Sequence, residues 1–210
     1  MLKLIVLDCD GVMFDSRKAN IAYYNDLLAA FGFPEMRDDE LEFVHMQSVT
    51  NSVKHIFRHY PQQDINEVFR RRKTLTYAPY LQHMKIEPDL VDFLKSAQTR
   101  YRLAISTNRT TTMGPLLEQY QLGSYFAKVV TASDVQNPKP APDALREILS
   151  FFDCRASETI YIGDSIVDRQ HTKACGVPLI AFKNKHLDAE YYVDSFAEVL
   201  QLEPFREELE

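Results

Sequence analysis

Cysteine is scarce in this sequence, and the spacing of the few present excludes two structural classes. The 210 residues include three cysteines, Cys9, Cys154 and Cys175, and no CxxC pair occurs. An odd number of cysteines without that spacing predicts neither a disulfide framework nor a zinc site. Cys9 lies between two aspartates, but side chains alternate along a strand, so its thiol should point away from them. We therefore do not expect a catalytic cysteine.

Positive charge is also in short supply. The chain has 24 lysines and arginines against 30 aspartates and glutamates, which gives a formal net charge of -6. Nucleic-acid binding depends on a basic surface that neutralises phosphates, so this balance argues against a nucleic acid as partner. A small anion could still bind at a local cationic site.

Long hydrophobic runs are missing as well. The apolar run between Lys3 and Asp8 is too short for a signal-peptide core, and no run approaches the roughly 18 apolar residues of a membrane-spanning helix. We therefore expect a cytoplasmic protein with no membrane partner. The length fits one large domain, or one domain that carries an insertion.

The most informative stretch is Leu4–Ser16, with the sequence LIVLDCDGVMFDS. Its unbroken apolar start predicts a parallel strand buried on both faces, and the carboxylates of Asp8 and Asp10 follow directly. The carboxyl ends of strands are where α/β folds bind ligands. These residues alone leave a plainer interpretation open, since aspartate and Gly11 are ordinary turn residues.

A helical insertion is predicted between the first two strands of the sheet. The next strand-like segment, 101–106, comes roughly ninety residues after the first, whereas a crossover between parallel strands needs only about a dozen. Between them, apolar residues recur at helical spacing, as in Ala22, Leu27, Leu28 and Phe31. We predict a helical domain over residues 17–82 and a core made of residues 1–16 and 83–210.

From residue 88 onward, helical and strand-like segments alternate. The expected strands are 102–106, 128–131, 159–163 and 178–182, and the expected helices are 88–99, 113–120, 142–151 and 166–174. Strands separated by helices predict an α/β fold with a mostly parallel sheet and helices on both faces. Residues 191–202 could add a short strand and a closing helix.

Three further polar segments follow these strands or lie in a loop beside them. Ser106–Arg109 combines hydroxyl and amide groups that could donate to phosphate oxygens. In Asn137–Pro142, three prolines fix the backbone around Lys139, and Gly163–Asp168 places two acids at a helix start. Each segment alone could be a cap, a turn or a solvated loop. Their occurrence along one edge of one predicted sheet favours a functional site.

Together the four segments resemble the motifs of the haloacid dehalogenase-like superfamily of hydrolases. The motifs are, in chain order, Asp8–Ser16, Ser106–Arg109, Lys139–Pro142 and Gly163–Asp168. The resemblance spans essentially the whole chain and is strongest to the phosphoglycolate phosphatase and β-phosphoglucomutase-like branch, which carries an α-helical cap. It implies that residues 17–82 are this cap, and that the core is three-layered and Rossmann-like with strand order 3-2-1-4-5.

The resemblance also implies how the acids are used. Asp8 would attack phosphorus and form an aspartyl phosphate, while Asp10 would protonate the leaving alcohol and then activate water. Mg²⁺ would be held by Asp8, the backbone carbonyl of Asp10, Asp164 and, directly or through water, Asp168. Such an ion is also expected independently of the resemblance, because converging carboxylates repel one another unless a cation lies between them, and Mg²⁺ prefers hard oxygen ligands.

The remaining motif residues are implied to bind the substrate anion: Thr107, Asn108, Arg109 and Lys139. Thr107 and Lys139 would stabilise the charge on the transferring phosphoryl group. We therefore expect a phosphatase that hydrolyses a small phosphorylated metabolite, phosphoglycolate-like or a sugar phosphate. We expect a monomer or a homodimer. An exposed position for Arg109 remains an alternative.

Other functions and sites stay open at this point. A phosphomutase uses the same motifs, and a non-catalytic regulatory relative would keep the same fold. A true dehalogenase is disfavoured, since attack on carbon needs no metal and the metal-binding acids are present.

In the helical domain, the basic residues Lys54, Arg58 and Arg70–Lys73 could either be solvated or attract an anionic substrate. His55 and His59 form at most half of a metal site.

Overall fold

The computed structural model describes residues 1–47 and 49–206. The chain forms two compact units, one made of Met1–Phe14 with Ile86–Glu210 and the other of Asp15–Lys85. The chain passes between the units twice, through β2 (Phe14–Asp15) and β3 (Lys85–Ile86), which form a small two-stranded sheet.

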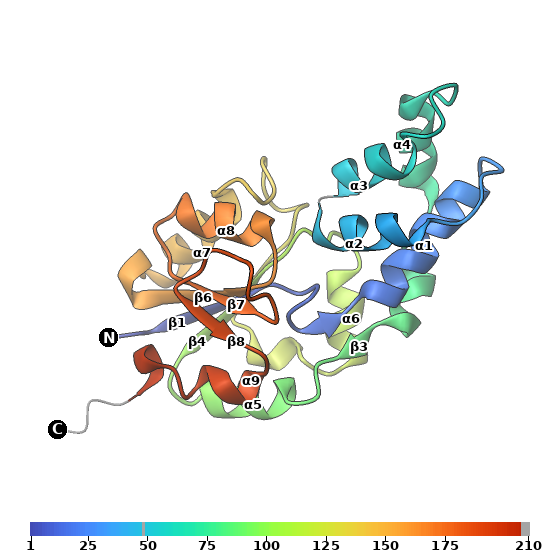
Figure 1. Cartoon of the computed structure of the whole chain (residues 1–210). Helices are drawn as coiled ribbons and strands as arrows, with labels where there is room; N and C mark the ends of the chain where they lie inside the picture. Colours follow the sequence, from blue (N-terminus) through green and yellow to red (C-terminus); the bar gives the residue numbers. More distant parts are fainter. Residues whose placement is uncertain (48, 207–210) are drawn as a thin grey trace. The chain divides into compact units, whose positions relative to one another are not determined.

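A six-stranded sheet forms the centre of the first unit (Figure 1). Its strands are β1 (Leu4–Leu7), β4 (Arg102–Ser106), β5 (Lys128–Val130), β6 (Thr159–Gly163), β7 (Leu179–Phe182) and β8 (Tyr191–Val193). They lie in the order β5-β4-β1-β6-β7-β8, and neighbouring strands are parallel. The predicted order of the first five strands is confirmed, and β8 extends the sheet beside β7.

The register of the sheet brings three strand ends to the same level. Leu7 of β1 lies beside Ile105 of β4 on one side and Ile162 of β6 on the other. The polar segments that follow these strands therefore leave the sheet along one edge, as expected for an α/β fold with its strands in this order.

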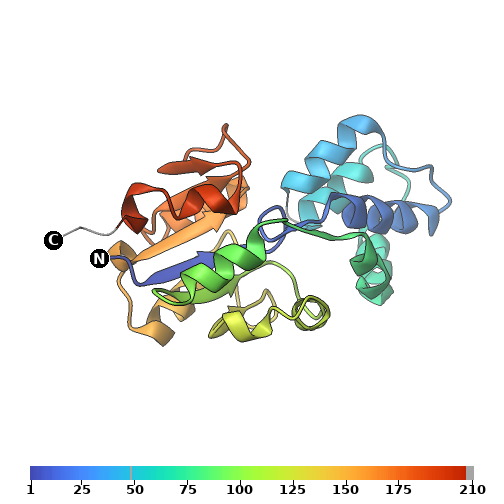
Figure 2. The same ribbon diagram turned by 90° about the horizontal axis from the view of Figure 1, so that it is seen from below.

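Helices cover both faces of the sheet, as Figures 1 and 2 show. The helices α7 (Asp143–Phe152) and α8 (Ile166–Lys173) lie on one face, and α5 (Leu90–Ala97) and α9 (Phe196–Val199) lie on the other. The remaining short helices of this unit are α6 (Met113–Gln119) and the 3₁₀ turns η2 (Gly123–Tyr125), η3 (Ala156–Glu158) and η4 (Glu203–Phe205). This is the three-layer α/β core that the sequence predicts.

The core is built from alternate faces of the strands. Leu4 and Val6 of β1 are fully buried in a cluster with Leu145 and Ile148 of α7. On the other face, Phe196 of α9 packs with its ring centroid 4.7 Å from that of Phe182 of β7. Burial of one such side chain stabilises the fold by about 1.5–3 kcal/mol, so the apolar runs read in the sequence fix the sheet in place.

The second unit is helical. Its elements are α1 (Arg17–Ala29), α2 (Asp38–Met46), α3 (Val49–Ile56), α4 (Ile65–Thr74) and the 3₁₀ helix η1 (Ala78–His83). The buried side of α1 includes Tyr23 and Leu27, which lie one helical turn apart. Tyr23 also packs edge-to-face on Tyr80, with ring centroids 5.5 Å apart. Gly32, with φ of +73°, ends the turn after α1 where a side chain would be strained.

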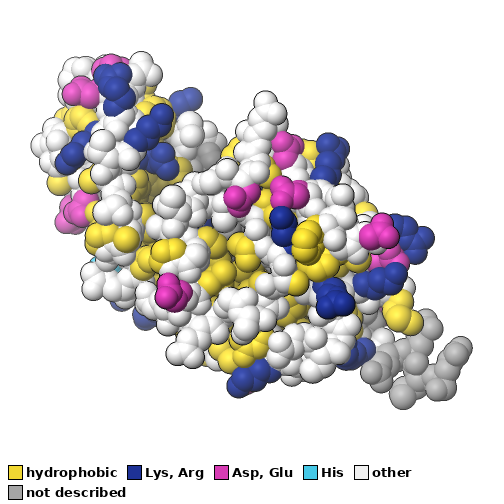
Figure 3. Space-filling model, turned by 180° about the vertical axis from the view of Figure 1, so that it is seen from behind, with side chains coloured by type: hydrophobic (Ala, Val, Ile, Leu, Met, Phe, Trp, Pro, Cys, Tyr) yellow, Lys and Arg dark blue, Asp and Glu magenta, His cyan; other side chains and the backbone are white. Residues whose placement is uncertain are grey.

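Two surface features bear on partners. Across the described residues, no helix combines the length and apolar character that crossing a bilayer requires. On the face shown in Figure 3, basic side chains are interspersed with acidic and uncharged ones.

Candidate active site

The loop directly after β1 holds Asp8 at the edge of the sheet. The Asp8 backbone N–H donates to the carbonyl of Ile162 at 2.9 Å, which continues the pairing of β1 with β6. Gly11 has a φ of +77°, a left-handed conformation that favours glycine. A Cβ at this position would lie 1.9 Å from Oδ2 of Asp164, so glycine also leaves room for that carboxylate.

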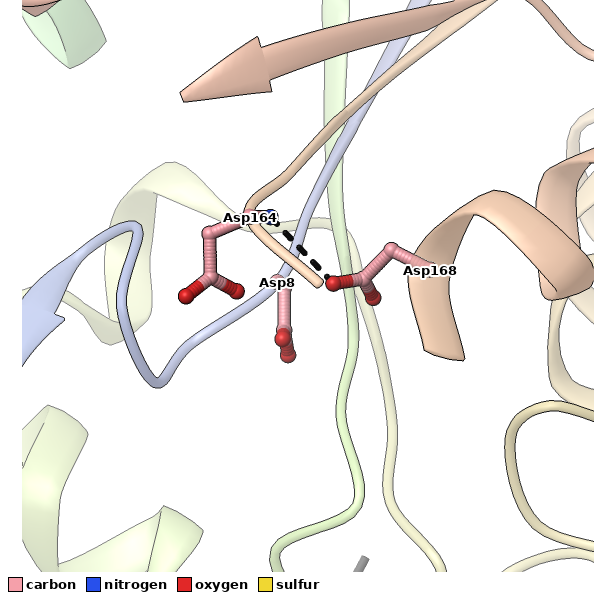
Figure 4. Close-up of side chains that lie close together, drawn as sticks. All are labelled: Asp8, Asp164 and Asp168. Atoms are coloured by element: carbon pink, nitrogen blue, oxygen red, sulfur yellow. Dashed lines mark hydrogen bonds between the residues drawn. The ribbon is translucent and has the colours of Figure 1, made fainter. Parts of the chain in front are cut away.

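Three carboxylates meet at this edge of the sheet. Asp8 follows β1, Asp164 follows β6, and Asp168 lies in the first turn of α8. Each offers an oxygen, and these oxygens lie within 4.8 Å of one another. Figure 4 shows the Asp8 carboxylate between the other two. The sequence prediction that these acids converge is therefore consistent with the geometry.

Asp168 is held in place by donors from the protein. Its Oδ2 accepts the backbone N–H groups of Asp164 (3.3 Å) and Ser165 (3.2 Å) and the Ser165 hydroxyl (2.6 Å). Its Oδ1 accepts from the Lys139 ammonium at 2.7 Å. Ser165 is the N-cap of α8, so the helix start and the acid fix each other. With its oxygens engaged in this way, Asp168 is better placed to orient Lys139 than to ligate a metal directly.

Lys139 is the cation at the centre of the site. It is buried, and its Nζ lies 2.9 Å from Oδ1 of Asp8 and 2.7 Å from Oδ1 of Asp168. The same Nζ donates to the hydroxyl of Tyr161 at 3.0 Å. Tyr161 is fully buried in β6, and its role could not be predicted from the sequence, where it is one more core residue of an apolar strand.

Burial and the neighbouring charges shift the pKa values of the three acids in different directions. Burial raises the pKa of Asp8 to about 7 despite the opposing effect of Lys139. Burial and the neighbouring Asp168 raise the pKa of Asp164 well above its usual range. Burial alone would raise the pKa of Asp168 too, but Lys139 and Ser165 outweigh burial and lower it. The two acids without sufficient positive charge nearby are thus Asp8 and Asp164.

These residues fit a divalent metal ion. The donors are all carboxylate oxygens, which hard cations such as Mg²⁺ and Ca²⁺ prefer. Asp8 and Asp164 are the acids that most need a further cation, because Lys139 supplies only one positive charge to three carboxylates. The acidic cluster could therefore bind a metal, mainly through Asp8 and Asp164, because the oxygens of Asp168 already accept hydrogen bonds from the protein.

The segment after β4 braces the loop that carries Lys139. Thr107 is buried, and its backbone N–H donates to the carbonyl of Val130 at 3.1 Å. The Asn108 side chain donates to the backbone carbonyl of Lys139 at 3.0 Å. Asn108, expected to contact substrate, is thus placed to fix the main chain at Lys139.

Arg109 does not lie on the surface. Its side chain is 5% exposed, and a terminal guanidinium nitrogen lies 2.6 Å from Oδ1 of Asp10. The alternative of an exposed arginine is therefore wrong. The reason is tertiary, because the pairing of β1 with β4 brings Asp10, 99 residues away in the sequence, to the guanidinium as a partner of opposite charge.

Comparison with known proteins agrees with this geometry. Residues 5–182 match the haloacid dehalogenase-like hydrolases. The chain belongs to this family. A haloacid dehalogenase-superfamily hydrolase of subfamily IA, variant 1, from Geobacter sulfurreducens is 32% identical, with a TM-score of 0.83; the match covers 96% of this chain and 99% of that one.

Curated relatives match over shorter stretches. A phosphoglycolate phosphatase from Pseudomonas syringae is 27% identical over 191 residues, which cover 85% of this chain and 68% of that protein. The phosphoglycolate phosphatase of Escherichia coli is 35% identical over 95 residues, or 44% of this chain and 38% of the relative. The alignment thus spans well under half of the E. coli protein. The resemblance drawn from the four motifs is confirmed.

A buried histidine of α8 connects two of the segments that form the site. His171 of α8 is fully buried, with Nδ1 2.6 Å from the carbonyl of Ala141 and Nε2 3.0 Å from the Ser106 hydroxyl. A carbonyl only accepts, so the proton is on Nδ1 and Ser106 donates to Nε2. His171 therefore ties α8 to the Lys139 loop and to β4. No sequence motif pointed to it.

His171 should make the fold less stable in acid. Burial, helped by Lys139, lowers its pKa to about 4, against an unfolded value of 6.5. As the pH falls from the unfolded value to the folded one, the unfolded chain binds a proton that the folded chain refuses. His171 should thus remove up to about 3 kcal/mol of stability across this window. Urea denaturation at several pH values should show that the difference in unfolding free energy between wild type and His171→Gln changes by this amount between pH 6.5 and 4. A difference that does not change with pH would contradict the lowered pKa of His171.

Gly163 should tolerate no side chain. A Cβ at this position would lie 2.6 Å from Cβ of Asp168, whereas a Cβ at Gly114 of α6 would meet no atom within 4 Å. We expect Gly163→Ala to destabilise the fold by about 1–3 kcal/mol and to lower activity more than tenfold by displacing Asp168. Gly114→Ala is the matched control, with stability unchanged or raised by about 1 kcal/mol. If Gly163→Ala and Gly114→Ala changed the melting temperature and the activity by the same amounts, this packing argument would be refuted.

Proposed function

We propose that this protein is a Mg²⁺-dependent phosphatase that hydrolyses a small phosphorylated metabolite through an aspartyl phosphate on Asp8. The observation that carries the proposal is the setting of Asp8, which lies at a strand end with Lys139 2.9 Å away and two further acids close by. A nucleophilic carboxylate, a cation for the phosphate and oxygen ligands for a metal are the parts that such a reaction requires.

In the first half-reaction, an oxygen of Asp8 bonds to phosphorus as the bond between phosphorus and the leaving alcohol breaks. The Asp10 carboxyl gives its proton to the departing oxygen, so that an alcohol is released rather than an alkoxide. Lys139 binds the negative charge on the transferring phosphoryl oxygens, and the buried Thr107 lies at the adjacent strand end to do the same.

In the second half-reaction, water attacks the phosphorus of the aspartyl phosphate. Asp10 now accepts the proton of that water, a bond forms between the water oxygen and phosphorus, and the bond to Asp8 breaks. Inorganic phosphate and the free Asp8 carboxylate result. Mg²⁺, held by Asp8 and Asp164 with Asp10 offering its backbone carbonyl, would supply positive charge that lets an anionic phosphate approach an anionic nucleophile.

The helical unit is proposed to act as a cap that selects the leaving group. Phosphoglycolate phosphatases are among the relatives that match this chain, which supports a small phosphorylated acid or sugar phosphate as substrate. A cap of this kind would keep bulk water from the aspartyl phosphate.

Removal of the metal gives the direct test of this function. Release of inorganic phosphate from a panel of phosphorylated acids and sugar phosphates should occur with added Mg²⁺ and fall at least 100-fold after chelation, because three clustered carboxylates repel a phosphate. Restoration by Mg²⁺ but not by the same concentration of Na⁺ serves as the control. A protein that turns over none of the panel with Mg²⁺, or that is indifferent to chelation, would refute the proposal.

A phosphomutase is the second candidate, because it uses the same motif residues. Product analysis separates the two reactions, since a mutase returns the phosphoryl group to a sugar and releases little inorganic phosphate. We expect inorganic phosphate to equal the alcohol product in amount.

A further inference from the structure

Asp10 and Arg109 form a close ion pair across two loops of the first unit. A terminal guanidinium nitrogen of Arg109 lies 2.6 Å from Oδ1 of Asp10. The Arg109 side chain is 5% exposed, whereas that of Asp10 is 34% exposed. The arginine is therefore the buried partner of the ion pair, and the Asp10 carboxylate is the partner that is partly exposed to solvent.

Arg109 is anchored at both its backbone and its side chain. Its backbone N–H donates to the hydroxyl of Thr107 at 3.2 Å, and its carbonyl accepts from the N–H of Ala132 at 2.9 Å. Its other terminal nitrogen donates to the hydroxyl of Thr112 at 3.1 Å. A guanidinium fixed in this way has one orientation, so the carboxylate bound to it has little freedom as well.

We propose that Arg109 is a positioning residue for Asp10 rather than a ligand for the substrate. The inference rests on the proposed function, in which Asp10 passes a proton to the leaving oxygen. Arg109 can only donate hydrogen bonds, so it engages Oδ1 of Asp10 as an acceptor and fixes the orientation of the carboxyl group. Among the described residues, Oδ2 of Asp10 has no hydrogen-bond partner, and it remains available to the leaving group.

The ion pair also argues against the expectation that Arg109 binds the substrate anion. A substrate carboxylate or second phosphate would have to displace Asp10 from the guanidinium, which would release the acid that the reaction needs. The two roles predict different substrate dependence. A positioning role affects every substrate with a poor leaving group, whereas an anion-binding role affects substrates that carry a second anion.

The experiment compares kcat/KM for three phosphomonoesters, since this constant reports the steps up to phosphoryl transfer to Asp8. p-Nitrophenyl phosphate has a leaving group that needs no proton, ethyl phosphate needs one, and phosphoglycolate needs one and carries a second anion. We expect Arg109→Met to lower kcat/KM for both alkyl phosphates by about 10–100-fold more than for p-nitrophenyl phosphate. Arg109→Lys, which retains a donor, should recover part of the loss.

Two further variants separate this role from a structural one. Thr112→Val removes the hydroxyl that anchors the guanidinium and should give the same substrate pattern at smaller size, even if Arg109→Met folds poorly. Arg102→Met alters an exposed arginine of β4 and should change none of the three constants. In an Asp10→Asn background, Arg109→Met should cost the alkyl phosphates little more, because the proton donor is already absent.

The outcomes are distinguishable. Equal losses on all three substrates would mean that Arg109 supports only the fold, and a loss confined to phosphoglycolate would mean that it binds the second anion; either result overturns the inference. Absence of turnover by the wild-type protein on every phosphomonoester would instead refute the proposed function itself.

Discussion

Asp8→Asn should lower phosphate release by about 10⁴-fold or more, the largest effect expected in this protein. An amide oxygen is a far weaker nucleophile than a carboxylate, and the proposed mechanism gives the neighbouring acids other roles, Asp164 at the metal and Asp168 at Lys139. Asparagine has nearly the same shape as aspartate, so the hydrogen bond from the Cys9 N–H to Oδ1, at 2.6 Å, can persist and the fold should survive. Steady-state phosphate release with the best substrate of the panel measures the effect.

Asp15→Asn is the matched control for the nucleophile. Asp15 lies in the same N-terminal motif, but it is exposed, and its side chain accepts from the backbone N–H of Arg17 at 3.0 Å. We interpret it as a capping acid at the start of the helical unit, so its loss should change the rate less than tenfold. Residual activity above one per cent in Asp8→Asn would contradict the nucleophile assignment.

Lys139→Met should have the second largest effect and should act on both stability and rate. Lys139 is buried between Asp8 and Asp168, and methionine of similar length would leave those carboxylates without their nearest cation. Loss of one partner of a buried ion pair costs about 3–5 kcal/mol. The rate should fall by about 100–1,000-fold, since charge on the transferring phosphoryl oxygens loses a stabilising group. Denaturation by urea and phosphate-release kinetics measure the two effects.

The double variant Lys139→Met with Asp168→Asn sharpens this prediction. Because the second substitution removes a carboxylate that the first leaves unpaired, the combined loss of stability should be smaller than the sum of the single losses. Lys173→Met, at an exposed position of α8, is the control and should change neither property. Additive losses would mean that Lys139 and Asp168 do not stabilise each other.

The fold could be predicted from the sequence because its strands are apolar runs with polar ends. Leu4–Leu7 is fully buried on both faces, and such a segment is recognisable without knowledge of its neighbours. The order of the strands, by contrast, came from the resemblance to a family. The short strand β8 and helix α9 at the end of the chain were also anticipated.

The supporting residues of the site could not be predicted in the same way. Tyr161 and His171 are buried polar side chains within otherwise ordinary core elements, and only the folded chain brings their polar atoms to Lys139 and Ser106. Local sequence carries no sign of a partner 65 residues away, as in the pair of Ser106 and His171. The motif residues were found because they lie at strand ends or in the loops and helix starts that follow, where polar side chains are not needed for packing.

The placement of Arg109 shows the same limit. Its sequence neighbours allowed either an exposed arginine or a substrate ligand, and both interpretations treated it as a group that faces solvent or ligand. The choice of Asp10 as its partner depends on the parallel pairing of β1 with β4, which brings together loops 99 residues apart. Charge alone could not have identified that partner among 30 acidic residues.

Detection of the covalent intermediate tests the central claim most directly. Asp10→Asn mixed with p-nitrophenyl phosphate and Mg²⁺ should still transfer the phosphoryl group to Asp8 but should hydrolyse the product slowly, because the group that activates water is missing. We predict a burst of about one p-nitrophenol per chain, with residue 8 converted to homoserine by borohydride, as read by mass spectrometry. Provided that the wild-type protein turns over the substrate, an adduct on a different residue of the variant would contradict the mechanism. The absence of any adduct on residue 8 of the variant would contradict it as well.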